Sequence, residues 1–118
     1  MKGQSFYKRV GFALCGLKMA ARREKSFRTH LVAAAAVLIV LYVTQPGIIW
    51  WTIIALTVGF VLVTELLNTA FETLADQLCP EEHSGIGAAK DIAAGAVLVA
   101  SLIGIIVGLV FILNWIGI

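Results

Sequence analysis

The sequence predicts an all-α membrane protein in which three transmembrane helices follow an N-terminal amphipathic helix on the membrane surface. The chain of 118 residues is 60% hydrophobic and has a mean hydropathy of +0.96, which is too apolar for an ordinary small soluble domain. Charged residues gather before the first apolar stretch and between the second and the third. We expect a single domain over residues 1–118, with spans at about 28–45, 48–68 and 92–117.

The surface helix is predicted at about residues 4–26, where apolar and basic positions alternate. This pattern is typical of a helix that lies on an anionic membrane surface. The alternative is that the Lys and Arg residues only determine topology. Glu24 is the sole acidic residue of this segment. An ion pair with Arg28, four residues further on, would explain Glu24 without any role in a site.

The first two spans are joined by a tight turn. Residues 31–43 carry no charge but are short for a hydrocarbon layer of about 30 Å, so the first helix must also include residues 27–30 and 44–45. Pro46-Gly47 then predicts a turn into the second apolar stretch, 48–64. No small-residue cleavage site follows the first stretch, which argues against a secretory signal.

The third span is predicted after a polar loop at residues 79–89, which hold Pro80 and two glycines. Small residues recur along this span at a spacing of four, a pattern that favours close helix packing: Ala96, Ala100, Gly104 and Gly108. Three helices enclose a polar site poorly. We therefore expect part of this small-residue stripe to contact another subunit of a homo-oligomer.

The charge distribution predicts the orientation. Eight of the nine Lys and Arg residues lie between Lys2 and Arg28, and all seven acidic residues lie between Glu24 and Asp91. The turn at 44–47 and the chain after Asp91 carry no charge. By the positive-inside rule, the N-terminus and residues 69–91 are cytoplasmic and the C-terminus faces outward. Any chemistry is then expected at the cytoplasmic face.

Four polar side chains mark a candidate site at the end of the second span. Offsets of 3, 7 and 11 residues place them within about 80° of one another on a helix: Glu65, Asn68, Glu72 and Asp76, here called the polar ladder. An ionisable group in a span costs about 2.5–3.5 kcal/mol at mid-bilayer, so Glu65 is a candidate functional residue. Such a ladder can hold a divalent metal, relay protons, or do both.

The residue types are compatible with metal-assisted phosphoryl transfer to a hydroxyl. Carboxylates of Glu24 and Glu72 suit Mg²⁺, and Lys90 supplies a cation for phosphate oxygens. A proton- or cation-coupled transporter and simple interhelical hydrogen bonding remain open. A small multidrug or cation exporter is disfavoured because the first span is uncharged. A non-catalytic membrane subunit would not need these three side chains together.

Residues 65–76 (ELLNTAFETLAD), 80–83 (PEEH) and 89–97 (AKDIAAGAV) resemble the signature of the prokaryotic diacylglycerol kinase family, which also contains undecaprenol kinases. Gly16-Leu17, Glu24, Phe27 and Arg28 fall at matching positions upstream, and the resemblance extends from Lys8 onward. It implies a homotrimer in the bacterial plasma membrane with composite active sites between subunits. It also implies ATP with Mg²⁺ as phosphoryl donor and a lipid alcohol as acceptor. We expect no nucleic-acid partner.

The resemblance assigns roles by position. Glu65 is expected to deprotonate the lipid hydroxyl, and Asn68 to order the site. Glu24 and Glu72 are expected to bind the metal. The side chains expected at the nucleotide are Glu81, His83, Lys90, Asp91 and Phe12, with Lys90 and Asp91 at its phosphate and sugar regions. Asp76 matches the motif and is given only a supporting role.

Two positions depart from the family pattern. Phe12 stands where a Tyr near the nucleotide is common, and Ser5 stands where some members have Arg. Three segments are more similar to the undecaprenol kinases than to the enterobacterial diacylglycerol kinases: 28–34, 79–81 and 93–98. We therefore expect undecaprenol rather than diacylglycerol as the acceptor.

Overall fold

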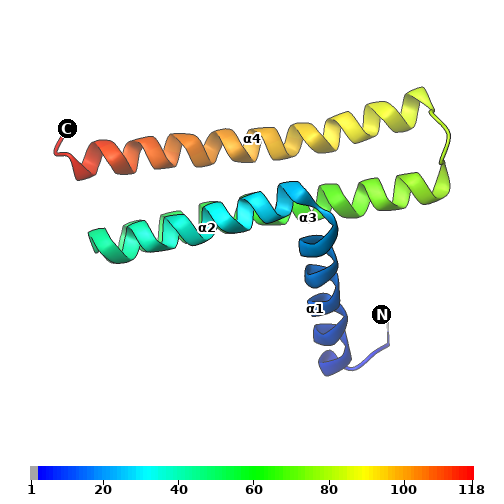
Figure 1. Cartoon of the computed structure of the whole chain (residues 1–118), viewed down its shortest axis with the longest axis horizontal. Coiled ribbons are helices and arrows are strands. Elements are labelled where there is room, and N and C mark those ends of the chain that lie inside the picture. The colour runs from blue at the N-terminus through cyan, green and yellow to red at the C-terminus, as the bar shows by residue number, and fades with distance from the viewer. Residues whose placement is uncertain (1–2) are drawn as a thin grey trace.

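The computed structural model describes residues 3–118 and consists of four helices (Figure 1); Lys2, counted above with the basic segment, lies outside the described residues. The helices are α1 (Phe6–Arg23), α2 (Lys25–Thr44), α3 (Ile48–Leu78) and α4 (Ser84–Trp115). The helices α2, α3 and α4 are each long and apolar enough to cross a membrane. The prediction of an all-helical chain with three helices of spanning length is therefore confirmed.

The first helix runs crosswise to the three long ones (Figure 1). Ser5 caps its start, because the Ser5 hydroxyl accepts a hydrogen bond of 3.3 Å from the backbone N–H of Lys8. The helix ends at Arg23, earlier than the predicted residue 26, because Glu24 has an extended backbone with φ −104° and ψ 109°. This single non-helical residue lets the chain turn from α1 into α2.

The turn between α2 and α3 forms where it was predicted. Gln45 adopts the left-handed conformation, with φ 47°, and its backbone N–H bonds to the carbonyl of Leu41 at 2.8 Å. Pro46 cannot continue a helix, so α2 stops here. The next helix, α3, runs antiparallel to α2, and α4 returns antiparallel to α3 (Figure 1). Because α3 packs against each of the other three helices, it is the central element of the fold.

The two later helices are longer than a bilayer requires. The 20 residues of α2 span about 30 Å, whereas the 31 of α3 and the 32 of α4 span about 46 and 48 Å. Both extend past the start of α2 (Figure 1). The predicted loop at 79–89 is wrong in its extent. The loop ends at His83, since the side chain of His83 caps a helix that already begins at Ser84.

The packed core is small. Leu41, Ile54 and Phe111 form a buried cluster, and the rings of Trp50 and Phe111 meet edge to face at 5.3 Å between centroids. Most other large apolar side chains of the long helices are exposed in the single chain. Such surfaces suit lipid or further protein rather than water.

The small-residue stripe of α4 faces α3 of the same chain over part of its length. Ala100 is 0% exposed. A methyl group at Gly104 would lie 3.8 Å from Cγ2 of Thr57. Ala96 is exposed. The contact with another subunit that was predicted for this stripe remains a prediction.

We expect the substitution Ala100→Leu to destabilise the fold by about 1–3 kcal/mol, because three extra carbon atoms overpack the α3–α4 contact. Unfolding of the purified protein in mixed micelles would measure the change. Ala96→Leu makes the same chemical change at an exposed position of the stripe and should alter stability little. Equal losses for the two variants would contradict this packing.

Candidate active site

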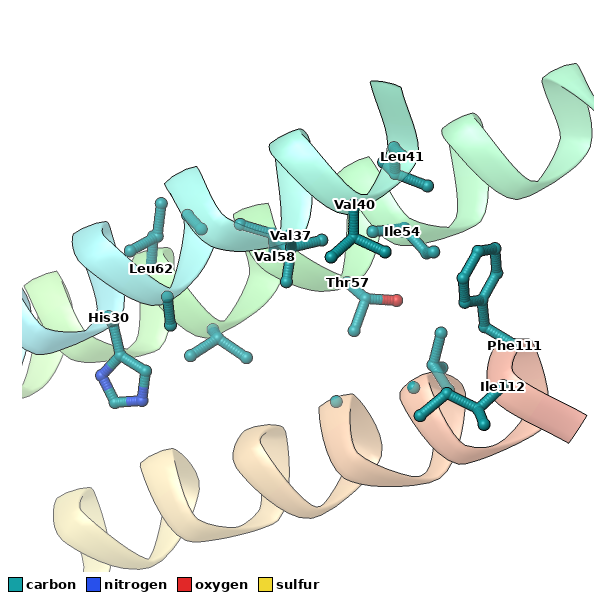
Figure 2. A pocket seen from close by; sticks show the side chains of 16 residues that line it. His30, Val37, Val40, Leu41, Ile54, Thr57, Val58, Leu62, Phe111 and Ile112 are labelled. Carbon is teal, nitrogen blue, oxygen red and sulfur yellow. The ribbon is translucent and has the colours of Figure 1, made fainter. Parts of the chain in front are cut away.

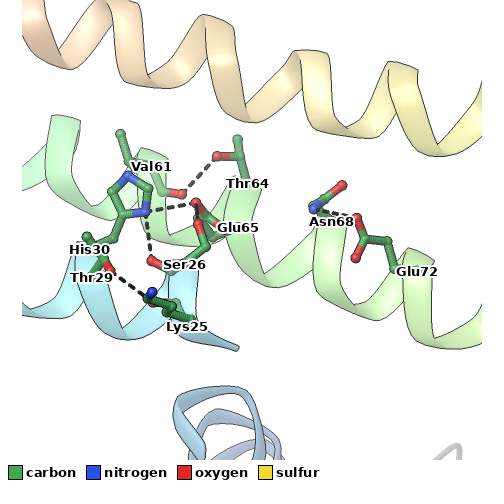
Figure 3. A network of polar contacts seen from close by, with 9 residues as sticks. All are labelled: Lys25, Ser26, Thr29, His30, Val61, Thr64, Glu65, Asn68 and Glu72. Carbon is green, nitrogen blue, oxygen red and sulfur yellow. Dashed lines mark hydrogen bonds and ion pairs between the residues drawn. The ribbon is translucent and has the colours of Figure 1, made fainter. Parts of the chain in front are cut away.

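Glu65 lies in the middle of α3 and is the only polar or charged residue among residues 3–118 that is buried. Two donors from α2 reach one of its carboxylate oxygens (Figure 3). The hydroxyl of Ser26 donates to Oε1 at 2.8 Å, and Nδ1 of His30 lies 2.8 Å from the same oxygen. We call Ser26, His30 and Glu65 the Glu65 cluster.

The hydrogen-bond partners of His30 define which ring nitrogen carries a proton. Nδ1 also lies 3.1 Å from the backbone carbonyl oxygen of Ser26. A carbonyl oxygen can only accept, so Nδ1 is protonated and donates. Ser26 and His30 are four residues apart and therefore share one face of α2. Neither residue was predicted as part of the site from the sequence, although His30 is itself an ionisable group at the end of a span.

An apolar groove of about 340 Å³ begins at His30 and runs between α2, α3 and α4 to Phe111 and Ile112 (Figure 2). His30 and Thr57 are the only polar side chains among its lining residues. The groove therefore has one polar end, beside Glu65, and apolar walls elsewhere. Its shape and chemistry suit a hydrocarbon chain whose polar terminus lies at the Glu65 cluster.

The polar ladder divides into separate contacts in the structure. Asn68 Nδ2 donates to Glu72 Oε1 at 3.2 Å. Asn68 Oδ1 is buried and has no partner in the described chain. A buried acceptor without a donor is costly, so this atom suits a donor from a ligand, water or another subunit.

Asp76 lies at the C-terminal end of the ladder and binds Lys90. The ammonium of Lys90 donates to Asp76 Oδ1 and connects the end of α3 to the start of α4. The hydrogen bond that Lys90 donates to Asp76 raises the pKa of Lys90 above its ordinary value. Lys90 therefore keeps its positive charge over the neutral pH range.

Glu24 and Glu72, the expected metal ligands, occupy different surroundings. Glu24 lies at the break between α1 and α2 and lines a groove of about 700 Å³ between α1 and α3, whose lining does not include Glu72. Across residues 3–118, no three His, Cys, Asp or Glu side chains converge as a metal site would require. Both residues offer the hard oxygen atoms that Mg²⁺ prefers. Their pairing as ligands stays a prediction.

The residues expected at the nucleotide are mostly exposed. Phe12 is 51% exposed on α1, and Glu81 and Asp91 are exposed at the end where α3 and α4 meet. His83 has a structural contact as well, since its Nδ1 accepts hydrogen bonds from the backbone N–H groups of Gly85 (3.0 Å) and Ile86 (3.4 Å). A Cβ atom at Gly85 would lie 3.1 Å from Cε1 of this ring. Glycine therefore allows the ring to approach the helix end.

The long apolar helices, the buried carboxylate and the groove that ends beside it together define a membrane protein with a site for an amphipathic molecule. Residues 11–112 match the family described as prokaryotic diacylglycerol kinase. The chain belongs to this family, and it is a lipid kinase of the diacylglycerol or undecaprenol kinase type. These comparisons give no support to the alternative functions, a small multidrug or cation exporter and a non-catalytic membrane subunit.

Several curated relatives are similar over most of the chain. An undecaprenol kinase of Bacillus subtilis is 43% identical over 108 residues, which are 92% of this chain and 88% of that protein. A diacylglycerol kinase of Escherichia coli K12 is 30% identical over 99 residues, with 84% and 81% covered. A diacylglycerol kinase of Synechocystis is 35% identical over 98 residues, which are 82% of this chain and 56% of that longer protein.

We expect His83→Ala to weaken the first turn of α4, because removal of an N-cap costs about 0.5–2 kcal/mol. The backbone amides of Gly85 and Ile86 should then exchange with deuterium faster. His83→Ser restores a capping oxygen and should recover the protection. Unchanged exchange in His83→Ala would contradict the cap. A loss of ATP binding in both variants would instead reveal a separate role of the ring at the nucleotide.

Proposed function

We propose that this protein transfers the γ-phosphoryl group of ATP, bound with Mg²⁺, to the hydroxyl of a membrane lipid. The expected acceptor is undecaprenol, which would give undecaprenyl phosphate. Diacylglycerol, which would give phosphatidic acid, is the alternative. The observation that carries the proposal is the buried Glu65 in contact with His30, the residue that lines the polar end of the apolar groove. The chain is 43% identical to an undecaprenol kinase, against 35% and 30% for two diacylglycerol kinases. This difference supports undecaprenol as the expected acceptor and diacylglycerol as the alternative.

The geometry suggests how the acceptor would react. With its chain in the apolar groove, a lipid alcohol presents its hydroxyl to the Glu65 cluster. Glu65 takes the hydroxyl proton, and the lipid oxygen forms a bond to the γ-phosphorus. The bond from that phosphorus to the bridging oxygen breaks, and its electron pair leaves with ADP. The unpaired Oδ1 of Asn68 can accept a hydrogen bond from a group ordered in the site.

Charge neutralisation is assigned to residues closer to the cytoplasm. Glu24 and Glu72 would hold Mg²⁺, which supplies positive charge against the phosphate oxygens when it is bound. Lys90 would add a second positive charge, held in place by Asp76. Phe12, Glu81, His83 and Asp91 would contact the rest of the nucleotide.

The proposed assembly is a homotrimer in the bacterial plasma membrane, with the N-terminus and α1 at the cytoplasmic surface and the C-terminus outside. Two features of the single chain support a site completed by another subunit. Glu24 and Glu72 do not line a common groove, and many large apolar side chains of α4 are exposed. A second subunit could supply the missing partner of the metal site and cover part of this apolar surface.

We expect the purified protein in lipid vesicles to transfer ³²P from γ-labelled ATP to undecaprenol, and more slowly to diacylglycerol, only when Mg²⁺ is present. Thin-layer separation of the labelled products with both lipids assayed side by side would measure this. Removal of Mg²⁺ with EDTA is the control. Absence of transfer to any lipid alcohol would refute the proposed function.

We expect Glu65→Gln to lower kcat by about 10²–10⁴-fold with nearly unchanged ATP binding, because the amide cannot accept the proton. Glu72→Gln should instead weaken binding of the metal–nucleotide complex. Steady-state kinetics and ATP titrations at several Mg²⁺ concentrations would separate the two effects. Glu82→Gln, at an exposed position without an assigned role, is the matched control. The same binding defect and residual rate in both variants would contradict the separate roles of base and metal ligand.

A further inference from the structure

We propose that His30, together with Ser26, is a positioning residue for Glu65 that assigns different tasks to its two carboxylate oxygens. Oε1 is held by the two donors, and Oε2 is left to take the proton of the acceptor hydroxyl. This inference rests on the proposed function and deepens it, because it adds two residues that no comparison or motif assigns.

The hydrogen bonds of the carboxylate are unevenly distributed. Oε1 lies 2.8 Å from the Ser26 hydroxyl oxygen and 2.8 Å from His30 Nδ1. No side chain of residues 3–118 donates a hydrogen bond to Oε2. Oε2 is nevertheless not one of the fully buried polar atoms that lack a partner. The side chain of Glu65 is only 4% exposed in the single chain, so Oε2 meets at most a narrow opening rather than bulk water. Its lone pairs are free, whereas those of Oε1 are already engaged by two donors.

The ring of His30 is fixed in a way that suits this role. Nδ1–H is shared between Glu65 Oε1 and the carbonyl oxygen of Ser26, 3.1 Å away, so rotation of the ring would break both contacts. The ring is 30% exposed in the single chain and lines the polar end of the apolar groove (Figure 2). It thus holds the carboxylate from the side on which a lipid hydroxyl would arrive.

Orientation of a catalytic group is worth a large factor in rate. A displacement of about 1 Å can cost about 100-fold, because the reacting atoms no longer meet in a productive geometry. Without its two donors, the side chain of Glu65 could rotate and present either oxygen, or neither, to the acceptor. The competing explanation is that Ser26 and His30 only attach α2 to α3. That role would affect stability rather than the chemistry of Glu65.

The test compares three substitutions of His30 in the full-length protein, using undecaprenol and ATP in vesicles. His30→Leu removes the donor, and we expect kcat to fall about 10- to 100-fold while KM for ATP changes less than about twofold. The amide nitrogen of Asn can occupy the place of Nδ1, so His30→Asn should recover most of the rate. Gln places its amide further from the backbone, so His30→Gln should recover less. Thr29→Val is the control, because its hydroxyl contacts only the carbonyl of Lys25.

A double-variant cycle separates positioning from stability. In a Glu65→Gln background there is no base to orient, so adding His30→Leu should cause no further loss of the residual rate. An equal fold-loss in both backgrounds, or full activity of His30→Leu, would overturn the inference. If the size-exclusion profile shows that His30→Leu does not fold, the two amide variants provide the test. A rate of His30→Asn that is no higher than the rate of His30→Gln would then overturn the inference. Inactivity of the parent protein, or full activity of Glu65→Gln, would refute the proposed function instead.

Discussion

The fold depends on the need to satisfy one buried carboxylate. Removing an ionised carboxyl group from water costs several kcal/mol unless donors replace the lost solvent. Glu65 obtains both of its donors from α2, within four residues of each other. The beginning of α2 must therefore lie beside Glu65 of α3. The non-helical Glu24 is where the chain turns from α1 into α2.

The central position of α3 follows from the same requirement. It packs with both α2 and α4, and its C-terminal part extends past the start of α2 (Figure 1). Near its C-terminal end Glu72 is half-buried and Asp76 is exposed. Burial thus decreases along the polar ladder from Glu65 to Asp76. One continuous helix in this way holds the proposed base, Glu65, and the more exposed carboxylates of Glu72 and Asp76 in a fixed relation. A loop in the middle of α3 would remove that relation.

The sequence allowed the helical class, the turn at Pro46-Gly47 and the buried Glu65 to be predicted, because each depends on local patterns of hydrophobicity and turn residues. The pattern did not reveal Ser26 and His30, since their partner lies 39 and 35 positions further along the chain. The loop after α3 was predicted too long because glycines suggested a turn, whereas a histidine ring caps the helix there. The polar ladder is predicted as one cluster along a single helix, but Glu65 finds its partners in α2 and Asp76 finds its partner in α4. The predicted pairing of Glu24 with Glu72 joins residues that do not line a common groove in the single chain, and local patterns do not describe contacts between such distant residues.

The apolar walls of the groove have an energetic consequence for delivery of the acceptor. A lipid carried through water to a soluble enzyme must expose its chain, at about 0.8 kcal/mol for each methylene group. A lipid that moves sideways from the bilayer into a groove lined by valine, leucine and phenylalanine exchanges one hydrocarbon environment for another. Under the proposed function, chain length would add little to the free energy of reaching Glu65, and a very long polyprenol could be taken up without an extraction step.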